Sequence, residues 1–210
     1  MTTSIAGHKG DEPVATFRLI PSRKGLIVIW ALLIAVNFNL VNLYPDVAVT
    51  GLIGNDEGMH LLATGLAVQS IIQRQDFTDP WQSAIGMGHP LFHYYQHLPH
   101  ISVALVHVLT LGVFPVADTV NWASYLLLCL FPLSLYWSMR LFGFDRLSSA
   151  MGGLVASLTA TNSLFGFDFG SYINRGLYTQ LWAMVLLPPA LASGYRVLLG
   201  GVGTSGRRRY

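Results

Sequence analysis

The stretch GLIVIWALLIAVNFNLVNLY, residues Gly25–Tyr44, contains no Asp, Glu, Lys or Arg. About 20 predominantly apolar residues are enough for a helix to cross roughly 30 Å of hydrocarbon. Three further runs of similar length also lack charge: Thr119–Met139, Leu147–Phe167 and Gly176–Tyr195. The sequence therefore predicts an all-α fold, a polytopic transmembrane helix bundle.

The composition of the whole chain agrees with a membrane setting. Of the 210 residues, 52% are hydrophobic and only 10% are charged, whereas about 25% of the residues of an ordinary soluble domain are charged. The chain lacks the ionic surface of a water-soluble protein, so we expect the lipid bilayer to be a partner.

A fifth apolar run, Ile101–Ala117, is shorter and contains His107. Lys and Arg next to membrane-spanning helices concentrate on the cytoplasmic side. If this run does not cross, ten of the twelve basic residues fall on one side, and only Arg74 and Arg175 fall on the other. We therefore predict about four crossings, with run 101–117 as an interfacial or re-entrant helix.

This topology divides the chain into three parts. We expect the protein to lie in the inner (plasma) membrane of a cell. A cytoplasmic tail (1–24) precedes the transmembrane region (25–200), and a basic cytoplasmic end (201–210) follows it, so both termini are cytoplasmic. We also expect the chain to be a fragment of a longer protein. The outer loops, 45–118 and 168–175, hold seven of the ten acidic residues. An acidic outer face suits a divalent cation or a sugar hydroxyl, and it gives no reason to expect nucleic acid.

Titratable residues are densest in Asn55-Asp56-Glu57-Gly58-Met59-His60, just beyond the first apolar run. The following residues, to about Gln75, have near-helical apolar spacing, which places Asn55 or Asp56 at the N-cap. Two interpretations remain open. Acidic residues in a first turn satisfy free amides and the helix dipole. Alternatively, Asp56 is a catalytic base supported by Glu57 and His60, or Asp56 and His60 hold Mg²⁺ or Mn²⁺.

The stretch Gly86–His100 is punctuated by glycine and then rich in Tyr and His, including His89, Tyr94 and Tyr95. Such side chains suit the headgroup level of a membrane, and they are candidates for substrate binding. A second interpretation is that His89, His93 and His97, which recur every four residues, line one helical face that holds a metal or haem.

The second outer loop contributes two more candidates for substrate binding, Asp168 and Arg175. A guanidinium beside a helix end is able to clamp a phosphate with two parallel hydrogen bonds, or simply to extend toward the membrane surface.

Polar and small residues within the apolar runs predict which faces meet protein. Asn39 and Asn42 share a face, and we expect both to point into the bundle because unpaired amides are costly in hydrocarbon. Ser149, Gly153 and Ser157 form a ridge of small residues that allows close helix approach. Prolines free backbone carbonyls and should bend their helices; they are Pro132, Pro188 and Pro189.

The order of these parts resembles the amino-terminal portion of the GT-C class of polytopic glycosyltransferases. The resemblance rests on three motifs: Asn55–His60, Gly88-His89-Pro90-Leu91-Phe92-His93-Tyr94-Tyr95, and Met139-Arg140-Leu141-Phe142-Gly143. The sequence is most similar to bacterial integral membrane proteins whose domain is named as related to 6-pyruvoyl-tetrahydropterin synthase.

The resemblance implies a function. In this class the acidic residue of the first loop is a catalytic base or metal ligand, which falls on Asp56. The donor is a polyprenyl-phosphate sugar, and transfer occurs at the outer face of the membrane. The sequence also leaves open a non-catalytic membrane subunit or transporter segment, and a histidine-based metal or haem carrier.

Overall fold

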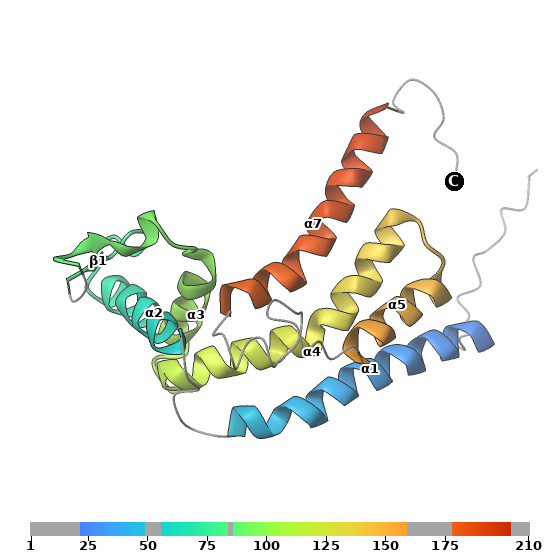
Figure 1. Ribbon diagram of the computed structural model, residues 1–210, viewed down its shortest axis with the longest axis horizontal. Coiled ribbons are helices and arrows are strands. Elements are labelled where there is room, and N and C mark those ends of the chain that lie inside the picture. The colour runs from blue at the N-terminus through green and yellow to red at the C-terminus, as the bar shows by residue number, and fades with distance from the viewer. Residues whose placement is uncertain (1–21, 49–55, 84–85, 159–177, 203–210) are drawn as a thin grey trace, which may run out of the picture.

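The computed structural model describes residues 22–48, 56–83, 86–158 and 178–202, and these residues are mostly helical. The helices are α1 (Arg23–Ala48), α2 (Glu57–Ile72), α3 (Leu98–Leu109), α4 (Val116–Phe142), α5 (Arg146–Leu158) and α7 (Tyr178–Val202) (Figure 1). A small antiparallel hairpin pairs β1 (Trp81–Gln82) with β2 (His89–Pro90), and the 3-10 turn η1 (Leu91–His93) follows it. The predicted all-α fold is confirmed.

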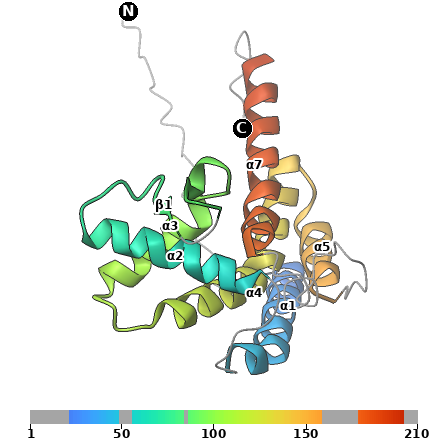
Figure 2. The same cartoon turned by 60° about the vertical axis from the view of Figure 1, so that its left-hand side comes forward.

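The helices form two groups. In the first, α4 packs against α1, α5 and α7, and we call these four helices the bundle. In the second, α2 packs against α3, and together with the hairpin and η1 they form what we call the outer layer. The outer layer contacts the bundle near the start of α4, as two views of the molecule show (Figures 1 and 2).

Three helices are long and apolar enough to cross a membrane. They are α1, α4 and α7, with suitable segments at Arg23–Tyr44, Val116–Phe142 and Tyr178–Gly200. The predicted run Leu147–Phe167 is described only to Leu158, the end of α5. The remaining residues of that run, and the second outer loop, lie outside the described residues.

The fifth apolar run does not form a single helix. We predicted an interfacial helix over 101–117, but α3 ends at Leu109 and α4 already begins at Val116. Between them Leu111 and Gly112 have positive φ angles of 55° and 70°, which end the helix and reverse the chain. The 12 residues of α3 rise only about 18 Å, which is too short to cross the hydrocarbon.

Pro132 determines how α1 meets α4. A proline has no N–H, so Pro132 leaves the carbonyl of Leu128, four residues earlier, without its helical donor. Asn39 of α1 supplies the donor, with its Nδ2 3.0 Å from the Leu128 oxygen. The Tyr125 hydroxyl donates in the other direction to the carbonyl of Leu40 at 2.7 Å. These two bonds fix the register of α1 on α4.

A second carbonyl freed by a proline joins α4 to α7. Pro189 deprives the carbonyl of Val185 of its helical donor, and the Ser134 hydroxyl of α4 donates to that oxygen at 2.5 Å. The carbonyls of Leu128 and Val185 thus each accept a hydrogen bond from a neighbouring helix, as backbone polar groups in hydrocarbon require.

Small residues bring α5 close to α1 and α4. The ridge of Ser149, Gly153 and Ser157 predicted such a close approach. Gly153 is buried, and a Cβ built on it would lie 2.7 Å from the carbonyl oxygen of Pro132 and 3.5 Å from Leu32 Cδ2. Ser149 is fully buried as well. Since real Cβ atoms do not approach a backbone oxygen so closely, only glycine permits this contact.

The prediction for Asn42 was wrong. Asn42 is exposed, and its Nδ2 donates to the carbonyl of Phe38 in its own helix at 2.7 Å. A side chain can satisfy its own amide by bonding four residues back, so Asn42 needs no partner helix.

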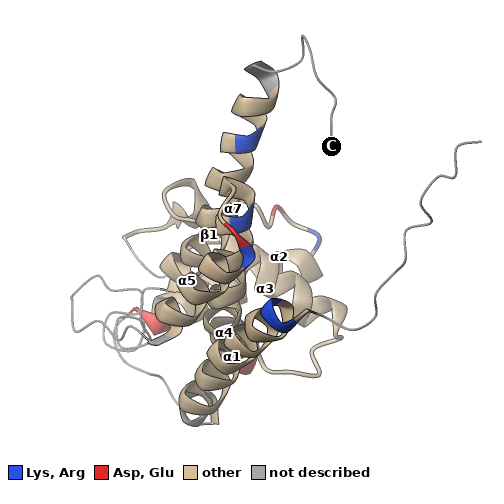
Figure 3. Cartoon of the chain, turned by 90° about the vertical axis from the view of Figure 1, so that its right-hand side faces the viewer, with Lys and Arg blue, Asp and Glu red and all other residues tan. Residues whose placement is uncertain are grey.

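The described basic residues are concentrated at the end of the bundle opposite the outer layer. Arg23 and Lys24 begin α1, Arg140 lies in the last turn of α4, and Arg146 begins α5. Arg196 of α7 reaches the same level, because its neighbour Tyr195 contacts Phe142 with ring centroids 5.2 Å apart. Between their ends the helices carry few charges (Figure 3).

We expect the Asn39 hydrogen bond to depend on the proline. Asn39→Ala should lower the free energy of unfolding in detergent micelles by about 1 kcal/mol. In a Pro132→Ala background the helix regains its own N–H donor to Leu128, so the same substitution should cost much less. Asn42→Ala is the matched control and should have little effect. Equal costs for Asn39→Ala in both backgrounds would contradict this account.

Candidate functional site

Asp56 stands at the entrance to α2 with its carboxylate exposed. It occupies the N-cap position, as predicted, but its φ and ψ are −82° and 0°, and its side chain makes no capping hydrogen bond. A typical N-cap has extended backbone angles and bonds the N2 or N3 amide through its side chain. The carboxylate of Asp56 is therefore not engaged in capping the helix.

Unlike the exposed Asp56, Glu57 and His60 are buried, with 3% and 2% of their surface exposed. They belong to the inner face of α2, which continues through Ala63, Thr64 and Ala67. Spacings of three and four residues put these side chains on one helical face, and the alanines allow close packing on α3. We expected Asp56, Glu57 and His60 to crowd together, but only the last two are inside.

The centre of the outer layer is a buried pair of histidines. His60 Nδ1 lies 3.1 Å from His100 Nε2, and the two rings stack with centroids 5.3 Å apart. His100 Nδ1 lies 2.8 Å from the carbonyl oxygen of Gln96. We call His60 and His100 the imidazole pair; it connects the first turn of α2 to the first turn of α3.

The hydrogen bonds assign the tautomers of the pair. A carbonyl only accepts, so His100 donates from Nδ1 to Gln96, and its Nε2 then accepts from His60 Nδ1–H. This arrangement requires His100 to be neutral. Burial lowers the pKa of His100 from 6.5 to about 4, reinforced by neighbouring His60 and His97 and opposed by the bond to Gln96. His100 is therefore neutral at physiological pH.

Aromatic rings enclose the imidazole pair. Phe92 of η1 stacks on His100 with centroids 5.6 Å apart. Tyr178, the first residue of α7, is fully buried, and its ring centroid lies 5.2 Å from that of His60 and 5.6 Å from that of His100. Tyr95 completes the enclosure at 6.0 Å from His60. The pair is thus the point where the outer layer meets the start of α7.

Tyr95 connects this interior to the exposed carboxylate. The pKa of Tyr95 is raised, first by burial and then by the negative charge of Asp56, while a hydrogen bond with the Thr179 side chain acts in the opposite direction. Tyr95 therefore keeps its phenolic proton beside the Asp56 carboxylate. The candidate site consists of Asp56 at the surface, Tyr95 and Thr179 beneath it, and the imidazole pair below.

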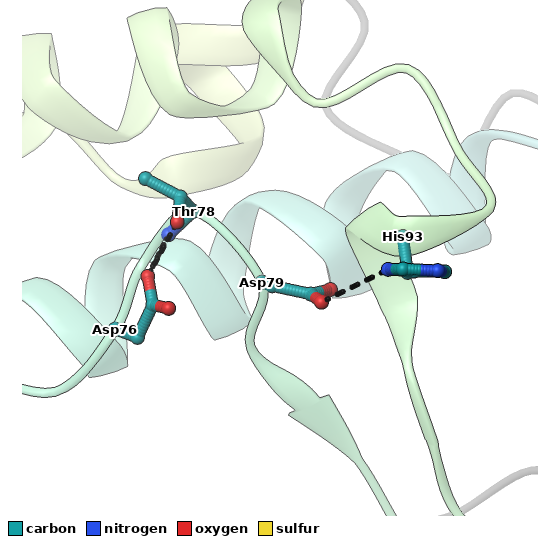
Figure 4. Close-up of polar contacts among 4 residues, drawn as sticks. All are labelled: Asp76, Thr78, Asp79 and His93. Carbon is teal, nitrogen blue, oxygen red and sulfur yellow. Dashed lines mark hydrogen bonds and ion pairs between the residues drawn. The ribbon is translucent and has the colours of Figure 1, made fainter.

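The connection after α2 is held by short polar contacts (Figure 4). The carboxylate of Asp76 accepts from the Thr78 amide at 2.8 Å, and the carboxylate of Asp79 lies 3.7 Å from His93 Nδ1. Gly88, with a φ of +91°, faces the Trp81 ring so closely that a Cβ would lie 2.8 Å from it. Of these contacts, the one between Asp79 and His93 reaches η1 itself, and it helps to place Phe92 over the imidazole pair.

Two of the predicted substrate-binding residues make their contacts with other residues. His89 belongs to β2, where it pairs with Gln82, and Tyr94 is 76% exposed with its ring against His93. Asp168 and Arg175 lie outside the described residues. Of the predicted substrate-binding residues that the structure describes, only Tyr95 joins the Asp56 site.

The predicted helical face of three histidines is wrong. His89 is in a strand, His93 ends a 3-10 turn, and His97 is the N-cap residue of α3. Pro90 starts only the short turn η1, and Pro99 lies in the first turn of the next helix, where proline is favoured. The spacing of four residues therefore does not bring these rings onto one face.

The predicted metal ligands do not form a complete ligand set in the described residues. No group of three His, Cys, Asp or Glu side chains in these ranges lies close enough to hold a metal ion. Asp56 is exposed, and His60 is buried with Nδ1 engaged by His100. Mg²⁺ requires six oxygen or water ligands in octahedral geometry, and these two residues supply only one carboxylate.

Sequence reasoning did not single out His100, Tyr178 or Phe92. His100 is the last histidine of a polar stretch before the apolar residues of α3, and it lies four positions before Ala104, so the two residues share a helical face. Both side chains are buried in the structure. The spacing therefore indicates a buried imidazole. It does not indicate His60 as the partner, because the two residues are 40 positions apart.

Comparison with known proteins finds no matching family model, no matching curated protein and no matching solved structure.

We expect the imidazole pair to make stability depend on pH. His100 has a lower pKa in the folded protein than when unfolded, so the unfolded chain binds the proton first as pH falls. Stability should be fully present above about pH 6.5 and decrease toward pH 4, by up to about 3 kcal/mol. His100→Gln, which keeps a donor and an acceptor, should flatten this dependence in unfolding measured in micelles. An unchanged dependence would show that His100 is not the titrating group.

Proposed function

We propose that this protein transfers a sugar from a polyprenyl-phosphate donor at the outer face of the membrane, with Asp56 as the general base. The observation that carries the proposal is the state of Asp56. Its carboxylate is exposed, makes no capping bond, and lies beside Tyr95 over an enclosed aromatic interior.

The proposed step uses few groups. The oxygen of an acceptor hydroxyl attacks the anomeric carbon of the sugar, and the bond from that carbon to the donor phosphate breaks. The hydroxyl proton passes to the Asp56 carboxylate, and the polyprenyl phosphate leaves with the electron pair of the broken bond. A positioned base of this kind contributes typically 10²- to 10⁴-fold to a rate. Tyr95, which keeps its proton, is placed to donate a hydrogen bond to a substrate oxygen.

The imidazole pair has a positioning role in this proposal. Neutral His100 holds His60, and His60 fixes the first turn of α2 that carries Asp56 and Glu57. A group held by packing and hydrogen bonds keeps the geometry that catalysis requires. We infer that the pair holds the turn in place and does not itself touch the reacting atoms.

An apolar groove between α4 and α7 supports a lipid-linked donor. It has a volume of about 270 Å³, and its walls include Phe131 and Leu135 of α4 and Met184 and Leu187 of α7. Gln180, two residues beyond Tyr178, lies at the end of the groove nearest the site. A polyprenyl chain in this groove would bring its phosphate toward Thr179, Tyr95 and Asp56.

The distribution of charge supports an orientation. Five of the six described basic residues lie at the bundle end away from the site, and the sixth, Arg74, follows α2. By the excess of Lys and Arg on the cytoplasmic side, the outer layer faces outward. We propose the inner (plasma) membrane as the location, with four crossings and both termini cytoplasmic.

Transfer should require the Asp56 carboxylate. In proteoliposomes with a polyprenyl-phosphate sugar, Asp56→Asn should reduce the rate by at least about 100-fold, because an amide does not accept the proton. Its thermal stability should stay near that of the wild type, since no capping bond is lost. Asp76→Asn, an exposed carboxylate after α2, is the control and should transfer normally. Near-normal transfer by Asp56→Asn would exclude Asp56 as the base, whereas no transfer by the wild type would favour the non-catalytic membrane subunit.

The orientation can be tested with single cysteines. In a Cys129→Ser background, Ser83→Cys of the outer layer should react with an impermeant maleimide added to intact cells. Ser22→Cys, which is exposed just before α1, should react only after the membrane is permeabilised. The reverse pattern would place the site in the cytoplasm and overturn the proposed outer-face reaction.

A further inference from the structure

We propose that a crevice between α1, α4 and α5, at the bundle end opposite the candidate site, binds the phosphate headgroup of an anionic phospholipid. The crevice has a volume of about 490 Å³. This inference is independent of the proposed function, since it concerns other residues and the other side of the membrane.

The crevice combines apolar walls with two arginines. Val28 and Ile29 of α1 form one wall, and Trp137 of α4 lies on another. Arg140, from the last turn of α4, and Arg146, the first residue of α5, also line it. Aromatic and basic side chains at a helix end are typical of the headgroup level of a membrane, and the aliphatic residues extend from there along α1.

The arginines are available to an anion. In the part of the chain that the structure describes, neither Arg140 nor Arg146 forms an ion pair with a carboxylate. Arg140 Nη1 donates to the carbonyl of Phe144, which holds the guanidinium in one position. A guanidinium presents five N–H donors, so one bond to a carbonyl leaves donors for a phosphate.

The nearby carboxylate of Asp145 is already engaged. It accepts from the amides of Leu147 and Ser148 at 2.9 and 3.1 Å, and from the Ser148 hydroxyl at 2.5 Å. These bonds, above all those with Ser148, lower the pKa of Asp145. Asp145 therefore stays ionised at the amino end of α5 with its oxygens occupied by these donors, and the two arginines outnumber it, so the crevice keeps a net positive charge.

The exposure of the walls indicates a lipid as the occupant, in preference to a free phosphate. Ile29 is 45% exposed and Trp137 is 60% exposed, although both are large and apolar. On helices that cross a membrane, such surfaces face acyl chains. A phospholipid satisfies both parts, because its phosphate pairs with the arginines by charge-assisted hydrogen bonds while its chains cover the aliphatic wall.

The test is lipid binding by the purified, delipidated chain in detergent, measured by native mass spectrometry with phosphatidylglycerol. The double variant Arg140→Gln/Arg146→Gln should bind about tenfold or more weakly, as expected when charge-assisted hydrogen bonds are lost. Arg196→Gln is the matched control, because it removes a charge at the same bundle end from a residue that does not line the crevice. It should bind like the wild type.

Three results would overturn the proposal. An equal loss in Arg196→Gln would indicate general surface attraction and no specific crevice. Phosphatidylcholine, whose ammonium offsets the phosphate charge, should bind more weakly than phosphatidylglycerol, and equal binding would exclude recognition of the negative charge. Glycerol phosphate that competes as well as the lipid would show that the acyl chains contribute nothing. If the double variant does not fold, Arg146→Gln alone carries the test, because Arg146 is exposed.

Discussion

Two carbonyl groups released by prolines determine how the bundle is assembled. In water a freed carbonyl is hydrated at little cost, but in hydrocarbon it requires a protein donor. Asn39 supplies one to Leu128, and Ser134 supplies one to Val185. Because each donor belongs to a neighbouring helix, the two bonds set the register of α1 on α4 and of α4 on α7. A slide of one helix would leave a carbonyl unpaired.

The position of the candidate site follows from this register. With α7 fixed on α4, its first residue, Tyr178, is placed against the outer layer, where it closes the imidazole pair of His60 and His100. The pair in turn holds the first turn of α2. Asp56 is thus positioned by hydrogen bonds within the bundle, although it is itself an exposed residue that makes no capping bond.

The molecule separates two kinds of polar chemistry at its two ends. At the outer layer, neutral rings are buried and the Asp56 carboxylate is exposed beside Tyr95. At the opposite end, arginines line an apolar crevice. Both arrangements fit a membrane, because an apolar bundle between them allows charge only at the interfaces.

Several features could be predicted from the sequence because their causes are local. The apolar runs predicted α1, α4 and α7, and the spacing of apolar residues predicted α2 within a few positions of its observed ends. Asn39 was recognised as a residue that needs a partner in the bundle, and Pro132 as one that frees a backbone carbonyl. Asn42 shows the limit of that reasoning, because the same residue type on the same face satisfied its amide within its own helix.

What the sequence by itself determined is the apolar bundle and the Asp56 motif at the start of α2, since both depend on composition and short-range spacing. Only the tertiary structure decided that Asn39 bonds Leu128, that His60 pairs with His100, and that Tyr178 covers them. Asn39 and Leu128 are 89 positions apart in the sequence, and His60 and His100 are 40 positions apart. Periodicity describes which face a side chain is on, but a hydrogen bond depends on a position in space that only the packing of whole helices fixes.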